Sequence, residues 1–485
     1  MVEANAPETE APEPEWLAQL FPHVGEPDEC GHRLKRIEAV ELPVGEGVGG
    51  QVTCELIHRA VDGSVHTVQA RFFLPPQLRE NPGSAVPLLY YAGYEVEAGV
   101  AAGFLARGWA VATPHAHPEN PLGRGPNLDI ALLHAARALP FVDNTQVMIQ
   151  GGSAGGYTAL MLAAETFPLV CALPGVPPVN WGYNAAFFFR HREVATAIPA
   201  GSDEPAMRVL TIVIPLGDAA RVSLGADTDA DSWLMSSPIS QLDTITAPTQ
   251  VVWSTGDILV PIDQVSSEFV RGLKPGAFPP GFTTSLADLL RRPEARRTLV
   301  DLLPDDAYEV FLVPTPPGAP ISEYEREPAG PPVPLELPFS RERVWSLVVV
   351  DEGPLEPDSG HFRYALVPVQ EPFLEWAVKR GVTADQLTFA KLRRLMLRLQ
   401  GEEYRPFTIQ PEGVGAPLDA VRLDFPAAER ADVLRGLLAF ARDDRRAQPL
   451  AATYAQLPPS LQALGPTLGD GAAPSVRAVL QAALG

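Results

Sequence analysis

The 485-residue sequence has few cysteines and few positive charges. Its three cysteines, Cys30, Cys54 and Cys171, lie in separate segments with no CxxC spacing, which excludes a disulfide framework and argues against a structural zinc site. The chain has 37 basic and 59 acidic residues, and the resulting net charge of −22 repels phosphate backbones and anionic lipids. We therefore expect free thiols, and neither a nucleic acid nor a membrane surface as a partner.

Long hydrophobic runs are missing as well. No run approaches the roughly 18 apolar residues from which a membrane-spanning helix is inferred. The first residues, MVEANAPETEAPEPEW, are acidic and rich in proline, without the basic start and apolar centre of a signal peptide. We expect a cytoplasmic protein. Its content of 46% hydrophobic and 20% charged residues is that of a globular enzyme and not of a disordered chain.

Strand and helix patterns alternate in the middle of the chain. Short apolar runs predict strands that are buried on both faces, at 87–91, 109–113 and 146–150. Amphipathic or apolar stretches after each of them predict helices, at 96–107, 128–139 and 157–166. This alternation predicts an α/β fold with a mostly parallel central sheet and helices on both of its faces.

Breaks in the alternation divide the chain further. Nine prolines between residues 314 and 338 exclude a helix or a central strand in that stretch. We expect a disordered acidic tail at 1–14, a β-rich segment at 15–80, the first part of the core at 81–175, a cap insertion at 176–245, a further core strand at 246–269, a proline-rich lid insertion at 270–340, the last core strand at 341–380 and a helical region at 381–485.

A glycine-rich motif between a strand and a helix carries the strongest chemical signal. Residues 150–157 read QGGSAGGY and contain the pattern GxSxG, with Ser153 at its centre. At such a turn the serine is held in a strained backbone conformation, and its hydroxyl is exposed at the carboxyl edge of the sheet. Glycine is expected at Gly151 and Gly155, because a Cβ atom there would strike the neighbouring strand or helix. We therefore predict that Ser153 is a nucleophile.

A serine nucleophile needs an adjacent base, and the base needs a carboxylate that orients it. In a fold of this kind the base follows the last strand, and His361, in DSGHF, is the one histidine of nine that does so. Asp257 ends an earlier core strand, in STGDILVP, where its carboxylate can accept the Nδ1 proton of the histidine. Asp263 is the main alternative for the acid, and Glu352 is a more distant one.

These motifs resemble a known family. The order Ser153, Asp257, His361 is that of α/β-hydrolases, and the motifs GGSAGGY, TGDILVP and SGHF are similar to those of the prolyl oligopeptidase branch, including its esterase-like and dienelactone-hydrolase-like relatives. The resemblance covers roughly 85–175, 236–265 and 344–380. It implies the α/β-hydrolase fold, here with cap insertions and a C-terminal helical extension. The family's peptidases also carry a large β-propeller, which the segment before the sheet is too short to form.

The negative charge that develops on a substrate carbonyl needs two donors. The backbone N–H of Ala154 is one candidate, and the other is the backbone of Gly93 or Tyr94 or a tyrosine hydroxyl of the loop 91–94. Six further side chains are candidates for a substrate pocket, although they would also fit an ordinary core or solvated loops: Tyr91, Trp181, Tyr183, Phe188, His115 and His117. The two histidines have the spacing of metal ligands, yet we expect neither a metal nor a cofactor.

Hydrolysis of a small carboxylic ester through an acyl-enzyme on Ser153 is the function we expect first. A peptidase or amidase with the same three residues is the main alternative, and it would bind a peptide terminus through Glu95 or the acidic stretch 227–231. Acyl or lactone transfer in a biosynthetic pathway is a further alternative. A binding protein without activity is the least expected, because all three triad positions are occupied.

Overall fold

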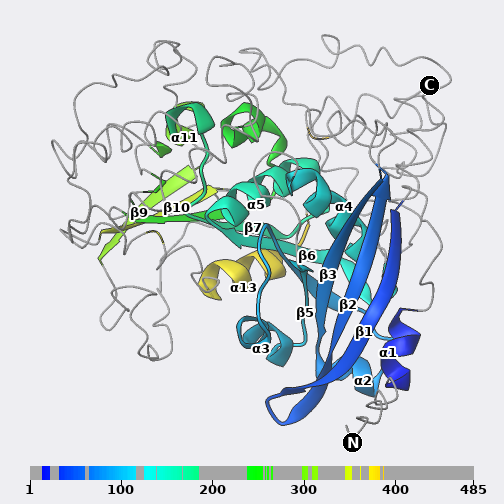
Figure 1. Cartoon of the computed structure of the whole chain (residues 1–485). Coiled ribbons are helices and arrows are strands. Elements are labelled where there is room, and N and C mark those ends of the chain that lie inside the picture. Colours follow the sequence, from blue (N-terminus) through cyan, green and yellow to red (C-terminus); the bar gives the residue numbers. More distant parts are fainter. Residues whose placement is uncertain are drawn as a thin grey trace, which may run out of the picture.

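One mixed sheet organises the molecule (Figure 1). The computed structural model describes residues 14–21, 32–59, 65–115, 125–137, 139–166, 168–184, 237–254, 257, 259–260, 264–265, 298–303, 308–314, 345–351, 361, 371–382, 386 and 391. Within these residues the sheet has ten strands, in the order β1-β2-β3-β5-β4-β6-β7-β8-β10-β9. No helix in this part of the chain is long and apolar enough to cross a membrane.

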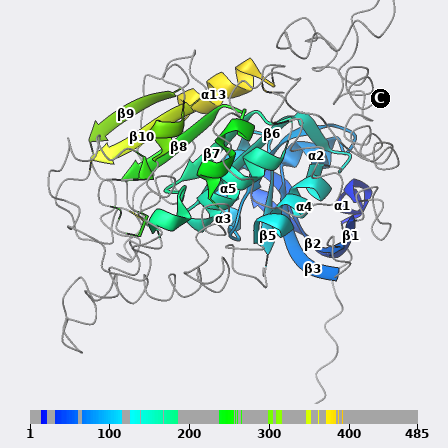
Figure 2. The same cartoon turned by 90° about the horizontal axis from the view of Figure 1, so that it is seen from above.

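The strands form an antiparallel ribbon that continues into a parallel sheet. Their bounds are β1 His32–Val44, β2 Gly47–Arg59, β3 Val65–Leu74, β4 Val86–Tyr91, β5 Ala110–His115, β6 Val142–Gly152, β7 Cys171–Gly175, β8 Thr249–Ser254, β9 Tyr308–Pro314 and β10 Trp345–Asp351. β1, β2 and β3 pair antiparallel, and β3 pairs antiparallel with β5. Every pairing from β5 to β9 is parallel. Figure 2 shows β9 and the ribbon β1–β3 at opposite ends of the sheet.

Helices cover both faces of the sheet. Their bounds are α1 Glu15–Leu20, α2 Pro76–Glu80, α3 Ala98–Ala106, α4 Gly125–Arg137, α5 Ala154–Glu165, the 3-10 helix η1 Pro238–Thr244, α11 Leu299–Leu302 and α13 Glu371–Arg380. Apolar residues of α4, α5 and η1 pack with one face of the sheet in the larger core. Apolar residues of α3 and α13 pack with the other face in a second core. The predicted α/β class, with a mostly parallel sheet between two layers of helices, is confirmed.

Two parts of the chain outside the expected core belong to the central sheet. The ribbon β1–β3 is part of the central sheet, since β3 pairs with β5 over five residues. The segment 270–340 is not an insertion throughout, because β9 forms the outer strand beside β10. An edge strand needs a partner on one side only, so a strand can end at Pro314, where the proline-rich stretch begins. The rest of the expected lid, the predicted helices after residue 391 and most of the expected cap lie outside the described residues.

The parallel strands bring several loops to one edge. β4, β6, β7 and β8 all run in the same direction, so the residues after their carboxyl ends meet there. β10 pairs directly with β8 from Trp345 to Val350, although a long stretch of chain separates them. The segments after β8 and β10 therefore lie side by side, and this pairing makes it possible for Asp257 and His361 to meet.

Candidate active site

Ser153 occupies a strained turn between β6 and α5. Its φ of 54° and ψ of −121° lie in a region that side-chain-bearing residues rarely adopt. Its backbone N–H donates to the carbonyl of Gly175 on the neighbouring strand β7 at 2.9 Å. Its own carbonyl accepts the N–H of Tyr157 at 3.0 Å, which closes the first turn of α5. The strained backbone that the motif predicts is thus present, and contacts on both sides hold it.

Glycines make this turn sterically possible. A Cβ atom at Gly151 would lie 2.3 Å from the carbonyl oxygen of Gly155, and a Cβ atom at Gly155 would lie 2.4 Å from that of Ala92. Real Cβ atoms do not approach backbone oxygens so closely. The strand β6, the helix α5 and the loop after β4 can therefore pack together only because these positions lack side chains.

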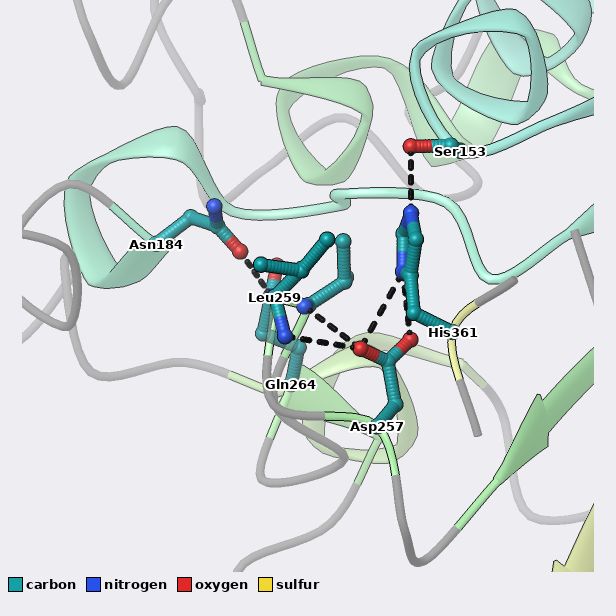
Figure 3. A network of polar contacts seen from close by, with 7 residues as sticks. Ser153, Asn184, Asp257, Leu259, Gln264 and His361 are labelled. Atoms are coloured by element: carbon teal, nitrogen blue, oxygen red, sulfur yellow. Dashed lines mark hydrogen bonds and ion pairs between the residues drawn. The ribbon is translucent and has the colours of Figure 1, made fainter. Parts of the chain in front are cut away.

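The structure brings Ser153, His361 and Asp257 into one chain of contacts (Figure 3). His361 Nε2 lies 2.8 Å from Ser153 Oγ, and His361 Nδ1 lies 2.9 Å from Asp257 Oδ2 and 3.1 Å from Asp257 Oδ1. A carboxylate only accepts hydrogen bonds, so the ring proton belongs on Nδ1. This tautomer leaves Nε2 as the acceptor for the serine hydroxyl.

A short loop fixes the carboxylate of Asp257. Asp257 Oδ1 accepts the backbone N–H groups of Leu259 and Val260, each at 2.9 Å. The side chain is fully buried, and a buried charge is tolerated only when it is hydrogen-bonded or paired in this way. One carboxylate therefore closes its own loop and faces the histidine. The alternatives Asp263 and Glu352 lie outside the described residues.

Gln264 connects the loop of Asp257 with the segment after β7. Gln264 Oε1 accepts the backbone N–H groups of Val179 and Asn180 at 3.0 and 2.9 Å, and its Nε2 donates to Asn184 Oδ1 at 2.7 Å. Figure 3 shows this amide pair beside the three residues above. Neither Gln264 nor Asn184 could be predicted from the sequence, since a lone glutamine or asparagine in a loop has no spacing that distinguishes it.

Tyr94 reaches the serine from the loop after β4. Burial of its hydroxyl raises the pKa of Tyr94, whereas hydrogen bonds with the Ser153 side chain and the Ala154 backbone lower it. The ring lies over the first turn of α5, because a Cβ atom on Gly155 would be 3.2 Å from Tyr94 Cδ2. The residue as a whole remains 40% exposed. A hydroxyl donor and the backbone of Ala154 thus converge beside Ser153.

The backbone N–H of Gly93 is engaged elsewhere. It donates to Asp129 Oδ1 on α4 at 3.2 Å, so it is not the donor that we expected for a substrate oxygen. Gly93 instead provides a turn, with a φ of 80°. A Cβ atom here would lie 2.6 Å from the Cα of Gly155. The residue is needed for the close approach of its loop to α5.

The expected pocket residues have different surroundings. Tyr91 is buried in the second core, because β4 carries it into the face that α3 and α13 cover. Trp181 is buried and its ring meets that of Tyr157 edge to face, with centroids 5.3 Å apart. Tyr183 is partly exposed, and its backbone N–H donates to Asn180 Oδ1 at 3.0 Å. Phe188 and His117 lie outside the described residues.

His115 belongs to a charged cluster at the end of β5. Arg71 on β3 forms a salt bridge with Glu95 Oε1, and His115 Nδ1 lies 2.7 Å from Glu95 Oε2. Arg71 Nη2 lies 3.1 Å from His115 Nε2. Nδ1 of His115 is within ion-pair distance of Glu95 without hydrogen-bond geometry, and Nε2 faces the guanidinium of Arg71. Among the residues placed by the structure, no three histidine, cysteine or acidic side chains gather in a way that could hold a metal ion.

Comparison with known proteins yields one family and several solved structures. Residues 129–203 match the model of the prolyl oligopeptidase family, a stretch that includes Ser153 but neither Asp257 nor His361. This match confirms the resemblance to the prolyl oligopeptidase branch. No curated protein matches the chain. The strand order and the strained serine between β6 and α5 are those of an α/β-hydrolase.

Solved structures with similar parts include peptidases and esterases. Dipeptidyl peptidase 4 of Porphyromonas gingivalis is 13% identical with a TM-score of 0.31, over 48% of this chain and 42% of that one. An acetyl xylan esterase from Paenibacillus sp. R4 is 17% identical with a TM-score of 0.30, over 47% and 75% of the two chains. An esterase of Pyrococcus furiosus is 14% identical with a TM-score of 0.31, over 46% and 77%. The chain spans less than half the length of the dipeptidyl peptidase.

Proposed function

We propose that the protein is a serine hydrolase that cleaves carboxylic esters through an acyl-enzyme on Ser153. The observation that supports this most is the continuous contact chain from Ser153 Oγ through His361 to Asp257, with 2.8 and 2.9 Å between successive polar atoms. These distances are within hydrogen-bond reach, which a nucleophile and its base require. The carboxyl edge of a parallel sheet is also where such sites form in open α/β folds.

The reaction begins when Ser153 Oγ attacks the ester carbonyl carbon and His361 Nε2 takes the hydroxyl proton. The C–O bond to the alcohol breaks, and His361 returns that proton to the leaving oxygen. A water molecule then attacks the acyl group and gives a proton to His361 Nε2, and the bond to Ser153 Oγ breaks with return of the proton. Asp257 keeps the Nδ1–H tautomer and stabilises the imidazolium during both halves.

Two hydrogen-bond donors would stabilise the negative charge that develops on the carbonyl oxygen of the substrate. The N–H of Ala154 and the hydroxyl of Tyr94 are the groups that approach Ser153 in this structure. Both groups are beside Ser153 at the start of α5, whose N-terminus also favours negative charge, which supports this assignment. Loss of one such donor costs about 10²- to 10³-fold in kcat in serine hydrolases with an oxyanion hole.

Amide cleavage is the second candidate, because the chain matches the prolyl oligopeptidase family over residues 129–203. A peptidase that recognises a peptide amino terminus needs a carboxylate that is free to bind it. Glu95, our candidate for this task, has its two oxygens in contact with Arg71 and His115. This arrangement argues against Glu95 as the group that binds an amino terminus, and the acidic stretch 227–231 lies outside the described residues.

The test is covalent labelling followed by a substrate comparison. A fluorophosphonate probe should label the wild-type protein and should not label Ser153→Ala. Turnover of p-nitrophenyl esters of increasing acyl length should then exceed turnover of aminoacyl p-nitroanilides. Labelling of the Ser153→Ala variant would exclude Ser153 as the nucleophile. Faster anilide than ester cleavage would favour the peptidase, and ester synthesis from an added alcohol in preference to hydrolysis would favour acyl transfer.

A further inference from the structure

We propose that Thr113, Asp129 and Arg71 are positioning residues that hold Tyr94 in place as an oxyanion donor. The inference rests on the proposed function and adds the device that fixes one of its donors. Each of the three side chains comes from a different element, namely β5, α4 and β3. Each holds a different part of the three-residue loop 93–95, and none of them needs to touch the substrate.

Asp129 holds the residue before Tyr94. Its side chain is buried on α4, with 1% of the residue exposed, and Oδ1 accepts the Gly93 N–H at 3.2 Å and the Tyr90 hydroxyl at 2.7 Å. If a buried carboxylate moved away from these donors, its charge would lose its hydrogen bonds, which costs a large amount of free energy. Gly93 in turn is pressed against Gly155. The loop is thus attached to α4 on one side and stopped by α5 on the other.

Thr113 holds Tyr94 itself. This residue of β5 is fully buried, and its Oγ1 donates to the carbonyl oxygen of Tyr94 at 2.8 Å. The same hydroxyl lies 3.3 Å from the carbonyl of Pro114. β5 is the direct neighbour of β4 in the sheet, so its end reaches the loop that follows β4. The carbonyl of Tyr94 is therefore fixed, and its side chain points from a backbone that cannot rotate freely.

Arg71 holds the residue after Tyr94. Its guanidinium forms a salt bridge with Glu95 Oε1, and its Nη2 lies 3.1 Å from His115 Nε2. A guanidinium has no acceptor, so Nε2 must accept and the ring proton of His115 belongs on Nδ1. That nitrogen faces Glu95 Oε2 at 2.7 Å. Arg71 thus holds Glu95 through Oε1, and Oε2 lies within ion-pair distance of His115, so Glu95 has a structural role at the end of this loop.

Fixed donors matter because their geometry is set before the reaction. An oxyanion donor contributes most when it needs no reorganisation as the charge develops. A misplacement of about 1 Å, caused even far from the reacting atoms, can reduce the rate of an enzyme by about 10²-fold. Tyr94 is 40% exposed, and the three contacts fix the backbone from which its side chain extends towards Ser153.

A double-mutant cycle with Tyr94→Phe tests the inference. Thr113→Val keeps the shape of the side chain and removes its hydroxyl, and we expect kcat for a p-nitrophenyl ester to fall about 10-fold with little change in KM. Thr113→Ser should restore most of this loss. In the Tyr94→Phe background Thr113→Val should cause no further loss in kcat, because the donor that it positions is already gone. Arg71→Met should behave in the same way.

The matched control is Thr145→Val. Thr145 lies near the start of β6, at the edge of the sheet opposite Ser153, and its Oγ1 donates to Asp143 Oδ1 at 2.7 Å. We expect this variant to keep the wild-type kcat. Equal losses from Thr113→Val with and without Tyr94 would overturn the positioning role and leave the proposed hydrolysis intact. A Tyr94→Phe variant with wild-type kcat would overturn the donor assignment and the inference together. Should Thr113→Val fail to fold, Arg71→Met carries the same cycle.

Discussion

Asp257 combines two tasks at the scale of the single residue. Its Oδ1 closes the loop through Leu259 and Val260, and both of its oxygens face His361. Asp257→Asn should keep the loop, because the amide oxygen can still accept the two N–H groups. The amide nitrogen would donate where an acceptor is required, and the histidine would hold the wrong tautomer. We expect a loss of about 10⁴-fold in kcat near neutral pH, as in serine-protease triads.

The measurement is ester turnover together with the melting temperature. A nearly unchanged melting temperature with a large loss in kcat would separate the tautomer effect from misfolding. Asp263→Asn is the matched comparison, because Asp263 is the rival for the same role. A larger loss in the Asp263 variant would show that the acid is assigned to the wrong carboxylate.

The described cysteines lead to a prediction about reactivity. Cys54 and Cys171 are free thiols with no exposed surface. Burial raises the pKa of Cys54 to about 12, and it raises that of Cys171 as well. A raised pKa keeps a thiol protonated at pH 8, and the thiolate is the reactive form. Iodoacetamide at pH 8 should therefore leave both residues unmodified in the native protein and modify both in guanidinium, as peptide mass mapping would show. Fast native modification of either thiol would contradict its burial.

At the scale of the element, the turn from β6 to α5 has no room for a side chain. Alanine is the better helix former, so Gly155→Ala at the start of α5 would be stabilising by propensity alone, by up to about 1 kcal/mol. Its Cβ atom would nevertheless lie 2.4 Å from the carbonyl oxygen of Ala92. We expect a lower melting temperature and loss of ester turnover, because the loop that carries Tyr94 must move.

The control is Gly103→Ala in α3, where a Cβ atom would meet nothing within 4 Å. Because the new side chain would contact nothing, only the higher helix propensity of alanine matters there. We expect a gain of about 0.5–1 kcal/mol in the free energy of unfolding at unchanged activity. Chemical denaturation of both variants measures the difference. A stabilised Gly155→Ala variant would mean that α5 and the loop after β4 do not touch.

The sequence allowed most of the described elements to be predicted, for identifiable reasons. The buried strands β4, β5 and β6 have continuous apolar runs, and the helices between them have a polar face or an apolar stretch of sufficient length. β9 was missed because it lies at the edge of the sheet and runs into the proline-rich stretch. Its place beside β10 depends on a pairing between distant segments, which no local pattern reveals.

The candidate site was predictable where a motif combines residue type with position. Ser153, Asp257 and His361 follow strands in a characteristic order, and the structure brings their side chains together. Their catalytic roles remain predictions. Asp129, Thr113 and Gln264 could not be found in this way, since each acts through one or two hydrogen bonds with distant residues. Such partners are set by the packing of the sheet and not by sequence spacing.

At the scale of the whole molecule, the antiparallel ribbon β1–β3 closes one side of the larger core. Residues of this ribbon and of α1 are fully buried there, among them Leu17, Val52, Leu56 and Phe72. A chain that starts at residue 81 would lose these contacts and expose the edge of β5, which invites aggregation. We expect such a truncation to be insoluble or inactive, whereas removal of residues 1–13 is the control. Solubility, ester turnover and gel filtration check this, and an active monomer from residue 81 would refute it.

The position of β10 has a consequence for the order in which the chain can fold during its synthesis. β9 precedes β10 in the chain but lies outside it in the sheet, where it pairs with β10. During synthesis β9 therefore leaves the ribosome before the strand on which it will dock, and it must wait for residues 345–351. The same late strand leads to His361, which the nascent chain still lacks after Ser153 and Asp257 have emerged. Ser153 therefore lacks its proposed base until β10 has been synthesised and the sheet can be completed.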